Sequence, residues 1–422
     1  MTAFRNTNAA IEVDRAPRVL RRTDLAIDAK PVAASDLSFR IHTDLSSIED
    51  VWRRFEATAD STPFQTFEWL AAWQRHVGAR SNIEPVVVVG SHADGSTAFI
   101  FPFGIEEHRA IRRLCWFGQD LCDYNAPLLA PDFSERVSRE RFLALWKDLR
   151  AQMQSDPRLR HDWIEFEKMP QIVGTQINPF TYLRVAPNAN SAHIAQLSTD
   201  WESFYRDKRS SATRRHDRSK RKRMAKFGDV RFSTMMNADD IRQTLDVLWD
   251  QKKQIFARKG ISDIFSRPGY REFFLDFATN AASKRFVHVS RVDVGATCAA
   301  ANFGIVFGDC YYHVLSSYCD GRIAHYGPGA LHLRDLMSYA IERGLRRFDF
   351  TIGDELYKSE WCDVLLHLCD FSTAATLRGV PASTASQSWR RLKRFIKQTP
   401  VIWRLVTQLR VAYGTLKSPR QK

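Results

Sequence analysis

HYGPGALHLRDLMSYAIERGLRRFDFTIGDELYKSEW, residues 325–361, is the stretch that decides the expected fold. Gly327 and Gly329 open a predicted helix of roughly four turns, because apolar residues follow at helical spacing and Gly344 can cap its end. The strand RRFDFTI comes next, with charged residues at its exit. A glycine turn before a helix can bind phosphate through free amide groups. A simple turn would look the same, and Pro328 has no N–H to donate.

Strands and helices alternate on both sides of this stretch. In the first half, residues 84–107 are typical of a hairpin that turns at Asp94-Gly95, and the strand RRLCWFG follows. A helix over about 134–153 and the strand DWIEFEKM complete this half. The second half has helices at about 200–227 and 238–259, and then the strands RFVHVSRVD, ATCAAANFGIVFG, CYYHVLSSY and VLLHLCDFS. The sequence therefore predicts a mixed α/β fold.

These patterns divide the chain into four parts. Residues 1–37 show no sustained hydrophobic period and are expected to form an N-terminal extension. Two α/β modules follow, at 38–190 and 191–375, and a polar stretch near Pro187 to Ser191 lies between them. The last part, 376–422, is expected to be a linker that leads into a basic amphipathic helix over 389–413, broken at Pro400.

The net charge of +14 comes from two short segments. Residues 207–226 carry ten Lys and Arg against two Asp, and residues 371–422 carry eleven Lys and Arg and no acidic residue. The rest of the chain is slightly acidic. Cations at the successive positions 220–223 would lie on all sides of a helix. This distribution favours a solvent-facing helix, or one that contacts phosphate groups, over a helix that recognises nucleic acid along one side. The C-terminal helix mixes aromatic and basic residues, as interfacial membrane helices do, although packing on the acidic body is the alternative.

The composition, 44% hydrophobic and 26% charged, is typical of a soluble globular protein. The seven cysteines form no CxxC pair, so we expect neither a zinc site nor a disulfide framework. No apolar run is long enough to span a membrane, and the arginine-containing residues 1–22 lack the apolar core of a secretory signal. We therefore expect a cytoplasmic protein, with possible peripheral contact at the inner membrane face.

Several segments together resemble the tandem acyltransferases of the GNAT superfamily that include the FemABX-like enzymes. The resemblance is closer to CelD-like proteins, which are associated with bacterial cellulose and exopolysaccharide formation. It covers roughly residues 40–375. The matching segments are PFQTFEWLAAW at Pro63, DYNAPLL at Asp123, the arginine-rich helix leading to FGDVRF, YGPGALHLRDLMSYAIERG, and FDFTIGDELYKSEW.

This resemblance implies two GNAT-like modules, each a mixed, mostly antiparallel twisted sheet flanked by helices, and acyl transfer from a thioester to an amine or hydroxyl. The family's loop, Arg/Gln-x-x-Gly-x-Gly/Ala, places cofactor contacts at Gly327, Gly329 and Ala330. Ala324 stands where the family has Arg or Gln. The donor therefore stays open between acyl-CoA or acetyl-CoA and the aminoacyl-tRNA that FemABX-like relatives use.

Direct acyl transfer needs a base, an oxyanion stabiliser and an acid for the leaving thiolate. Asp354 and Glu355 are candidate bases, and Tyr357 is a candidate acid. Lys358 matches a family lysine thought to neutralise a phosphate or a carbonyl oxygen, and a surface ion pair is its alternative. Ser316 and Ser317 lie in no G-x-S-x-G elbow, which argues against an acyl-enzyme hydrolase.

Acceptor contacts are expected from Asp123 and Tyr124, which follow a strand of the first module, and from His313, which should share a strand face with Tyr311. A core histidine is the alternative for His313. The predicted function is acyl transfer to a small or envelope-related and exopolysaccharide-related acceptor. Two alternatives stay open: a non-catalytic scaffold of a membrane-associated polysaccharide synthase, and an aminoacyl-tRNA-dependent transferase.

Overall fold

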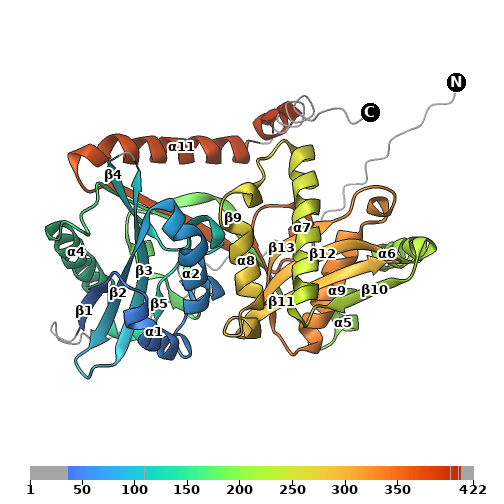
Figure 1. Ribbon diagram of the computed structural model, residues 1–422, viewed down its shortest axis with the longest axis horizontal. Helices are drawn as coiled ribbons and strands as arrows, with labels where there is room; N and C mark the ends of the chain where they lie inside the picture. The colour runs from blue at the N-terminus through green and yellow to red at the C-terminus, as the bar shows by residue number, and fades with distance from the viewer. Residues whose placement is uncertain (1–36, 109, 400, 407, 410–422) are drawn as a thin grey trace.

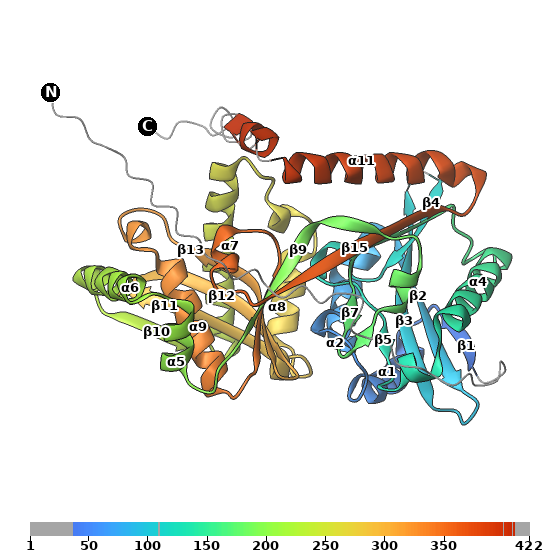
Figure 2. The same cartoon turned by 180° about the vertical axis from the view of Figure 1, so that it is seen from behind.

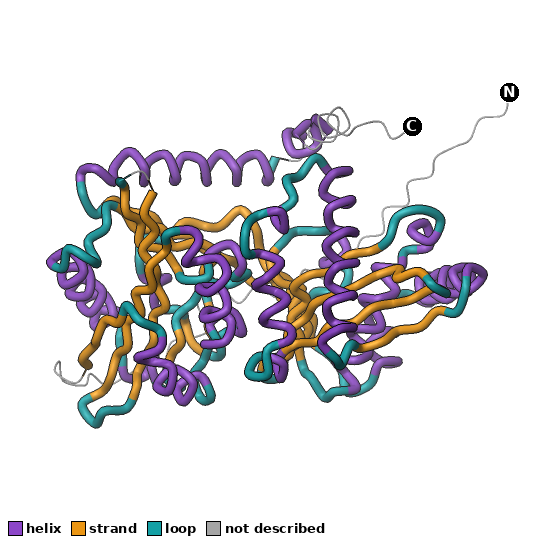
Figure 3. The backbone as a smooth tube through the Cα atoms, viewed as in Figure 1, coloured by secondary structure: helices purple, strands orange, loops and turns teal. Residues whose placement is uncertain are grey.

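The computed structural model describes residues 37–108, 110–399, 401–406 and 408–409. Two lobes lie side by side, and one sheet of 13 strands runs through both (Figures 1 and 3). The predicted mixed α/β fold with a mostly antiparallel sheet is confirmed. The expected N-terminal extension lies outside the described residues except for Leu37.

The strands are β1 (Leu37–His42), β2 (Ile83–His92), β3 (Thr97–His108), β4 (Ile111–Trp116), β5 (Leu128–Leu129), β6 (Trp163–Pro170), β7 (Ile172–Val173), β8 (Gln176–Ile177), β9 (Ala186–Gln196), β10 (Val230–Thr234), β11 (Val287–Val294), β12 (Thr297–Phe307), β13 (Cys310–Tyr318), β14 (Arg347–Ile352) and β15 (Val364–Ala374). The helices are α1 (Glu49–Glu56), α2 (Phe67–Trp73), α3 (Phe133–Arg136), α4 (Arg139–Ser155), α5 (Trp201–Lys208), α6 (Ser211–Met224), α7 (Ala238–Lys259), α8 (Tyr270–Thr279), α9 (Pro328–Glu342), α10 (Leu356–Ser359) and α11 (Val380–Gln398).

The order of strands in the sheet is β1-β2-β3-β4-β6-β15-β9-β14-β13-β12-β11-β10, with β5 beside β3. Each lobe contains one parallel pair, β4 with β6 and β13 with β14, and the other printed pairs of this sheet are antiparallel. The long strands β9 and β15 connect the lobes, and β15 lies between β6 and β9 (Figure 2). The module boundary expected between residues 190 and 191 therefore falls inside β9.

Two other expectations about the elements differ from the structure. The basic helix expected over 200–227 is two helices, because Ser210 has an extended backbone and its side chain accepts a hydrogen bond from the Thr213 amide, which caps α6. The linker expected at 376–388 already contains the first half of α11, and Pro381 fits into the first turn of this helix.

Aromatic side chains hold the lobes together. Trp69 on α2 packs edge-on against Phe273 and Phe277 on α8, with ring centroids 4.8 and 4.9 Å apart. Within the first lobe, Phe103 of β3 stacks on Phe166 of β6 at 5.0 Å. Edge-to-face pairs of buried rings add to the stability that their burial supplies. The seam between the lobes is thus a packed interface, and residues on its two sides keep a fixed relation.

Candidate functional site

The parallel strands β13 and β14 pair only near their beginnings. Their register joins Tyr311 to Phe348 and Tyr312 to Asp349, and it ends there. Thr351 then adopts a φ of +57°, which is a strained, left-handed conformation for a β-branched residue. The end of β14 pairs with β9 instead, with Ile352 opposite Ala192. The two strands therefore diverge toward the end of the sheet where α9 begins.

The predicted cofactor-binding residues lie together at the start of α9. Gly327 has a φ of +70°, and its carbonyl accepts the amide of Leu331 at 3.1 Å. The amides of Gly329 and Ala330 fall in the first turn, which has no intrahelical acceptor for them. A Cβ on Gly329 would lie 3.2 Å from the Tyr318 ring, so glycine permits this close packing. Free amides and the helix dipole make this turn suited to an anion.

The basic helix α6 packs beside this turn. Asp217 of α6 is buried, accepts the Tyr205 hydroxyl at 2.6 Å, and pairs with Arg334 of α9 at 2.9 Å. This anchor positions the half-buried Lys220, whose Nζ lies 4.0 Å from the place that a Cβ on Gly327 would occupy. Lys220 forms no ion pair with any other described residue. An ammonium group from α6 thus lies beside the loop in which Ala324 replaces the Arg or Gln of the resembled family.

A second group of side chains meets at the seam between the lobes. The hydroxyl of Tyr124, in the first lobe, donates to Oδ1 of Asp349 on β14 at 2.7 Å. The same oxygen accepts the Thr351 amide at 2.7 Å. Asp123 interacts with the Thr351 side chain and with the charges of Lys168 and Lys358. Acceptor residues predicted in the first lobe are therefore joined to the strand exit of the second.

Burial perturbs both carboxyl groups of this cluster. Asp349 is 3% exposed, and its burial, with the charge of Asp123 nearby, raises its pKa to about 6. Burial also raises the pKa of Asp123, although Lys168 and Thr351 oppose the shift. A carboxylate with a raised pKa takes up a proton at physiological pH more readily than an ordinary one. The pair is suited to act as a base.

Lys358 is buried beside these carboxyl groups, with 3% of its surface exposed. Its ammonium donates to the carbonyl of Ile352 at 3.0 Å and pairs with Glu355 at 3.0 Å. Burial opposes ionisation of Glu355, but Lys358 outweighs it and lowers the pKa of that carboxyl. Burial of Lys252, on α7, lowers the pKa of its amine to about 8. Two amines and their carboxylate partner thus face the seam.

His313 lies in the core of the second lobe. It is 7% exposed, and its ring contacts Phe348, on which Tyr311 also stacks, so the predicted shared face is confirmed. Burial, with the charges of Lys358 and Lys252, lowers the pKa of His313 to about 3. This histidine is therefore neutral at physiological pH. Its contact with Phe348 agrees with the core alternative, and its contact with the acceptor stays a prediction.

Asp354 and Tyr357, two further predicted catalytic residues, contact residues outside the cluster around Asp349. Asp354 lies in the loop between β14 and α10 and contacts β9, where its Oδ1 accepts the Ser191 amide at 3.2 Å and lies 3.6 Å from Nε2 of His193. Burial lowers the pKa of His193, but Asp354 and Cys362 together outweigh it and raise that pKa to about 9. Tyr357 packs against Phe350, and burial raises the pKa of its hydroxyl. Of the four predicted catalytic residues, Glu355 and Lys358 join the seam cluster most directly.

Sequence reasoning missed Asp349 and Lys252. Asp349 alternates with Phe348 and Phe350 in β14, so it lies on the opposite face from two core residues, and an acid inside a strand was the available signal. Lys252 gave no such signal, since it lies in the polar run QKKQ, which reads as a solvent-facing helix surface.

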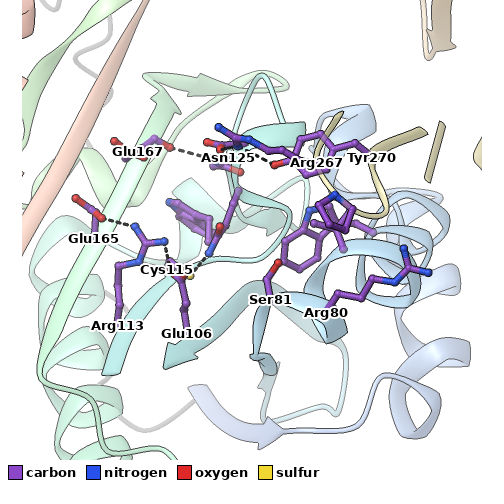
Figure 4. A pocket seen from close by; sticks show the side chains of 16 residues that line it. Arg80, Ser81, Glu106, Arg113, Cys115, Asn125, Glu165, Glu167, Arg267 and Tyr270 are labelled. Atoms are coloured by element: carbon purple, nitrogen blue, oxygen red, sulfur yellow. Dashed lines mark hydrogen bonds and ion pairs between the residues drawn. The ribbon is translucent and has the colours of Figure 1, made fainter. Parts of the chain in front are cut away.

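A pocket of about 460 Å³ opens in the first lobe, beside the parallel pair β4 and β6 and the start of α8 (Figure 4). Arg113 bridges Glu106 and Glu165 at its wall, as Figure 4 shows. Two buried polar atoms at the pocket have no hydrogen-bond partner among the described residues: Nε1 of Trp116, a donor, and Oδ1 of Asn125, an acceptor. Aromatic and charged groups also line the pocket, among them Trp73, Tyr270, Glu167, Asp120 and Arg267.

Comparison with known proteins identifies the second lobe. Residues 211–359 match the family model described as an acetyltransferase (GNAT) domain, which spans α6 to α10 and includes the α9 turn. Most of the second lobe thus matches a GNAT domain. The protein is accordingly a transferase, and Lys220, Gly327, Asp349 and Lys358 all belong to the matched segment.

The fold of FemX, a solved structure, is similar to this chain over both lobes, and two further solved structures also match it. FemX is 9% identical, with a TM-score of 0.52, over 79% of this chain and 96% of its own. A protein of unknown function from Bacteroides thetaiotaomicron VPI-5482 is 11% identical, with a TM-score of 0.49, over 79% and 99% of the two chains. A tandem GNAT protein from the clavulanic acid biosynthesis pathway is 10% identical, with a TM-score of 0.43, over 80% and 98%. No curated protein matches the chain.

The GNAT domain thus confirms the acyltransferase part of the predicted resemblance, whereas the CelD-like grouping stays a prediction. Within the described residues, no cluster of His, Cys, Asp or Glu is placed to hold a metal ion. Among the described helices, none has the length and apolar character needed to cross a membrane.

Proposed function

We propose that the protein transfers an acyl group from a thioester donor, acyl-CoA, to an amine or hydroxyl acceptor at the seam between the lobes. The observation that carries this proposal is the junction of Tyr124 with Asp349. It joins the first lobe to the strand exit of the GNAT domain. A donor bound at the α9 turn and an acceptor bound in the first lobe would both approach this junction.

The donor's phosphate groups would bind the amides of Gly329 and Ala330 and the ammonium of Lys220. Lys220 thereby supplies the positive charge that position 324 lacks. The exposed cations of α6 nearby add a favourable potential for a phosphate-bearing donor. Acetyl-CoA and longer acyl-CoAs meet this requirement, and so does aminoacyl-tRNA.

The transfer forms a bond between the acceptor N or O and the thioester carbonyl carbon, and it breaks the C–S bond. Asp123, which is partly accessible, takes the acceptor's proton. The buried Asp349 and Tyr124 position Asp123 for this step. Lys358 stabilises the negative charge that develops on the carbonyl oxygen. Tyr357, which its raised pKa keeps protonated, gives a proton to the leaving thiolate.

The acceptor would bind in the pocket of the first lobe. Asn125 lines this pocket and follows Tyr124 directly in the chain, so the pocket and the seam share one loop. The unpartnered Trp116 donor and Asn125 acceptor suit a ligand that carries both kinds of group, such as a hydroxyl-rich sugar. This chemistry agrees with an acceptor from envelope or exopolysaccharide assembly.

Calorimetry with acetyl-CoA and longer acyl-CoAs tests the donor. We expect micromolar binding by the wild type, loss of binding in Gly329→Trp, and at least about tenfold weaker binding in Lys220→Ala. Lys222→Ala, which removes an exposed cation of the same helix, is the matched control and should weaken binding by no more than about twofold, because a solvent-exposed charge is screened. Binding of tRNA without CoA binding would instead assign the aminoacyl-tRNA donor, and binding of neither would favour the scaffold.

A further inference from the structure

The C-terminal helix α11 is attached to the first lobe through polar contacts. It lies along β15, β9 and β6 (Figures 1 and 2). Ser386 and Arg390 bond Glu165, and Arg390 also lies 3.3 Å from Glu167. One turn later, Arg394 donates to the Pro187 carbonyl at 3.1 Å. These contacts recur every four residues, so one side of α11 faces the body, and that side is polar and basic.

The opposite side of α11 is apolar and faces away from the protein. Trp389, Leu392 and Phe395 are 64%, 47% and 59% exposed, and their spacing of three places them on one stripe. In a globular protein the apolar stripe of a surface helix normally faces the core. The orientation of α11 is the reverse, so packing within this chain does not account for these three side chains.

The same pattern continues beyond α11. Residues 401–406 and 408–409 are helical, and Val401, Leu405 and Leu409 are 68%, 53% and 69% exposed at a spacing of four. Two successive helical segments therefore present apolar side chains to the surroundings. Single exposed apolar residues need no explanation, whereas a row of them along a helix marks an interaction surface.

The charges beside the stripe have one sign. Arg391 and Lys393 flank it, are exposed, and form no ion pair with any described residue. Residues 371–422 contain no Asp or Glu, so the acidic partners of the inner face, Glu165 and Glu167, belong to the body alone. Large apolar side chains between unpaired cations are the composition of helices that lie in the interface of an anionic bilayer.

We propose that α11, together with residues 401–406 and 408–409, lies flat on an anionic phospholipid surface, with Trp389, Leu392 and Phe395 inserted between the headgroups. Arg391 and Lys393 then meet the lipid phosphates, and the inner cations continue to hold the helix on the body. The surface is separate from the seam and the α9 turn. It would hold a GNAT transferase at a membrane without a spanning segment, and it adds a location to the activity proposed above.

Sedimentation of the full-length protein with vesicles tests this surface. We expect binding to phosphatidylcholine vesicles that contain phosphatidylglycerol, weaker binding at high salt, and little binding to phosphatidylcholine alone. Trp389→Ser/Leu392→Ser/Phe395→Ser should reduce binding at least about tenfold. Met236→Ser, at a residue 69% exposed on the other lobe, is the matched control and should bind normally. Point variants are preferable to deletion of α11, because the deletion would also remove Arg390, the ion-pair partner of the buried Glu165.

Tryptophan quenching by brominated lipids gives a second readout. The tryptophan fluorescence of the wild type should be quenched on binding. Trp389→Phe should still bind, but its fluorescence should be quenched measurably less. The proposal is overturned if the wild type does not bind anionic vesicles, or if the triple variant, with an unchanged melting temperature, binds as tightly as the wild type. It is also overturned if the wild type dimerises through the stripe and the triple variant, although monomeric, still binds vesicles as the wild type does.

Discussion

The hydroxyl of Tyr124 and the Oδ1 of Asp349 are 2.7 Å apart, although 225 positions separate the two residues in the chain. Both are nearly fully buried. This bond joins a loop of the first lobe to the parallel strand pair of the GNAT domain, so a change on one side of the seam reaches the other. The lobes therefore act as one unit at the point where we place the chemistry.

Tyr124→Phe should destabilise the folded protein by about 1–3 kcal/mol, because it removes one of the two hydrogen bonds that the buried Oδ1 of Asp349 accepts and leaves only the Thr351 amide as its donor. Chemical denaturation measures this change. Tyr326→Phe is the control, since no hydrogen bond of that hydroxyl is present among the described residues. An unchanged free energy of unfolding in Tyr124→Phe would show that the bond does not couple the lobes.

Asp123→Asn should reduce the rate of acyl transfer about 10²- to 10⁴-fold, the usual contribution of a general base, and should change the melting temperature little. Release of free thiol from acyl-CoA in the presence of acceptor measures the rate. Asp250→Asn, an exposed acid on α7, is the matched control. Equal rates in both variants would remove Asp123 from the proposed chemistry.

The transfer rate should fall as the pH decreases through about 6. The pKa of Asp349 is raised to about 6, and the pKa of Asp123 is raised as well. The cluster therefore becomes protonated at a higher pH than ordinary carboxyl groups do. A pH profile of kcat/KM measures this acidic limb. A profile that stays flat down to pH 4.5 contradicts a carboxylate base with a raised pKa.

His193 and Asp354 should stabilise the protein in a pH-dependent way. The pKa of His193 is raised in the folded state to about 9 from its ordinary 6.5. Its contribution is therefore fully present below pH 6.5 and is lost as the pH rises through 9. The difference in unfolding free energy between the wild type and His193→Gln should shrink over that range. A difference independent of pH would show that the imidazole is not charged.

Lys358→Ala should abolish transfer and also destabilise the protein by about 1–3 kcal/mol. The loss of stability is expected because the buried ammonium donates to the Ile352 carbonyl, which would lose this partner. Denaturation and thiol release on the same variant separate the two effects. Normal turnover would exclude Lys358 from charge stabilisation.

Local patterns predicted the elements well. The hairpin at 84–107, the helix from Gly329 and the strand RRFDFTI all occur, because each depends on turn residues and on periodicity within about 25 residues. The position of β15 between β6 and β9 was not predictable, since strand order depends on contacts between segments about 200 residues apart. The polar stretch 187–191 was read as a boundary, although backbone pairing with β15 and β14 makes it a strand.

The candidate site shows the same limit. The α9 turn and Lys358 belong to one contiguous motif, and sequence reasoning found them. The role of Asp349 depends on Tyr124, which only the folded chain brings within hydrogen-bond distance. Lys220 could be seen only as one cation among ten in residues 207–226, because its place beside Gly327 depends on how Asp217 anchors α6.

The place of β15 has a consequence for biosynthesis. β6 ends at Pro170, and β15, the strand that pairs with its free edge, ends only at Ala374. Roughly 200 further residues must be translated first, which takes on the order of 10–40 s at usual ribosome speeds. During that time the nascent first lobe has an uncovered edge strand, and such edges invite pairing with other chains. The ribosome-bound chain should therefore depend on chaperones until its C-terminal part emerges.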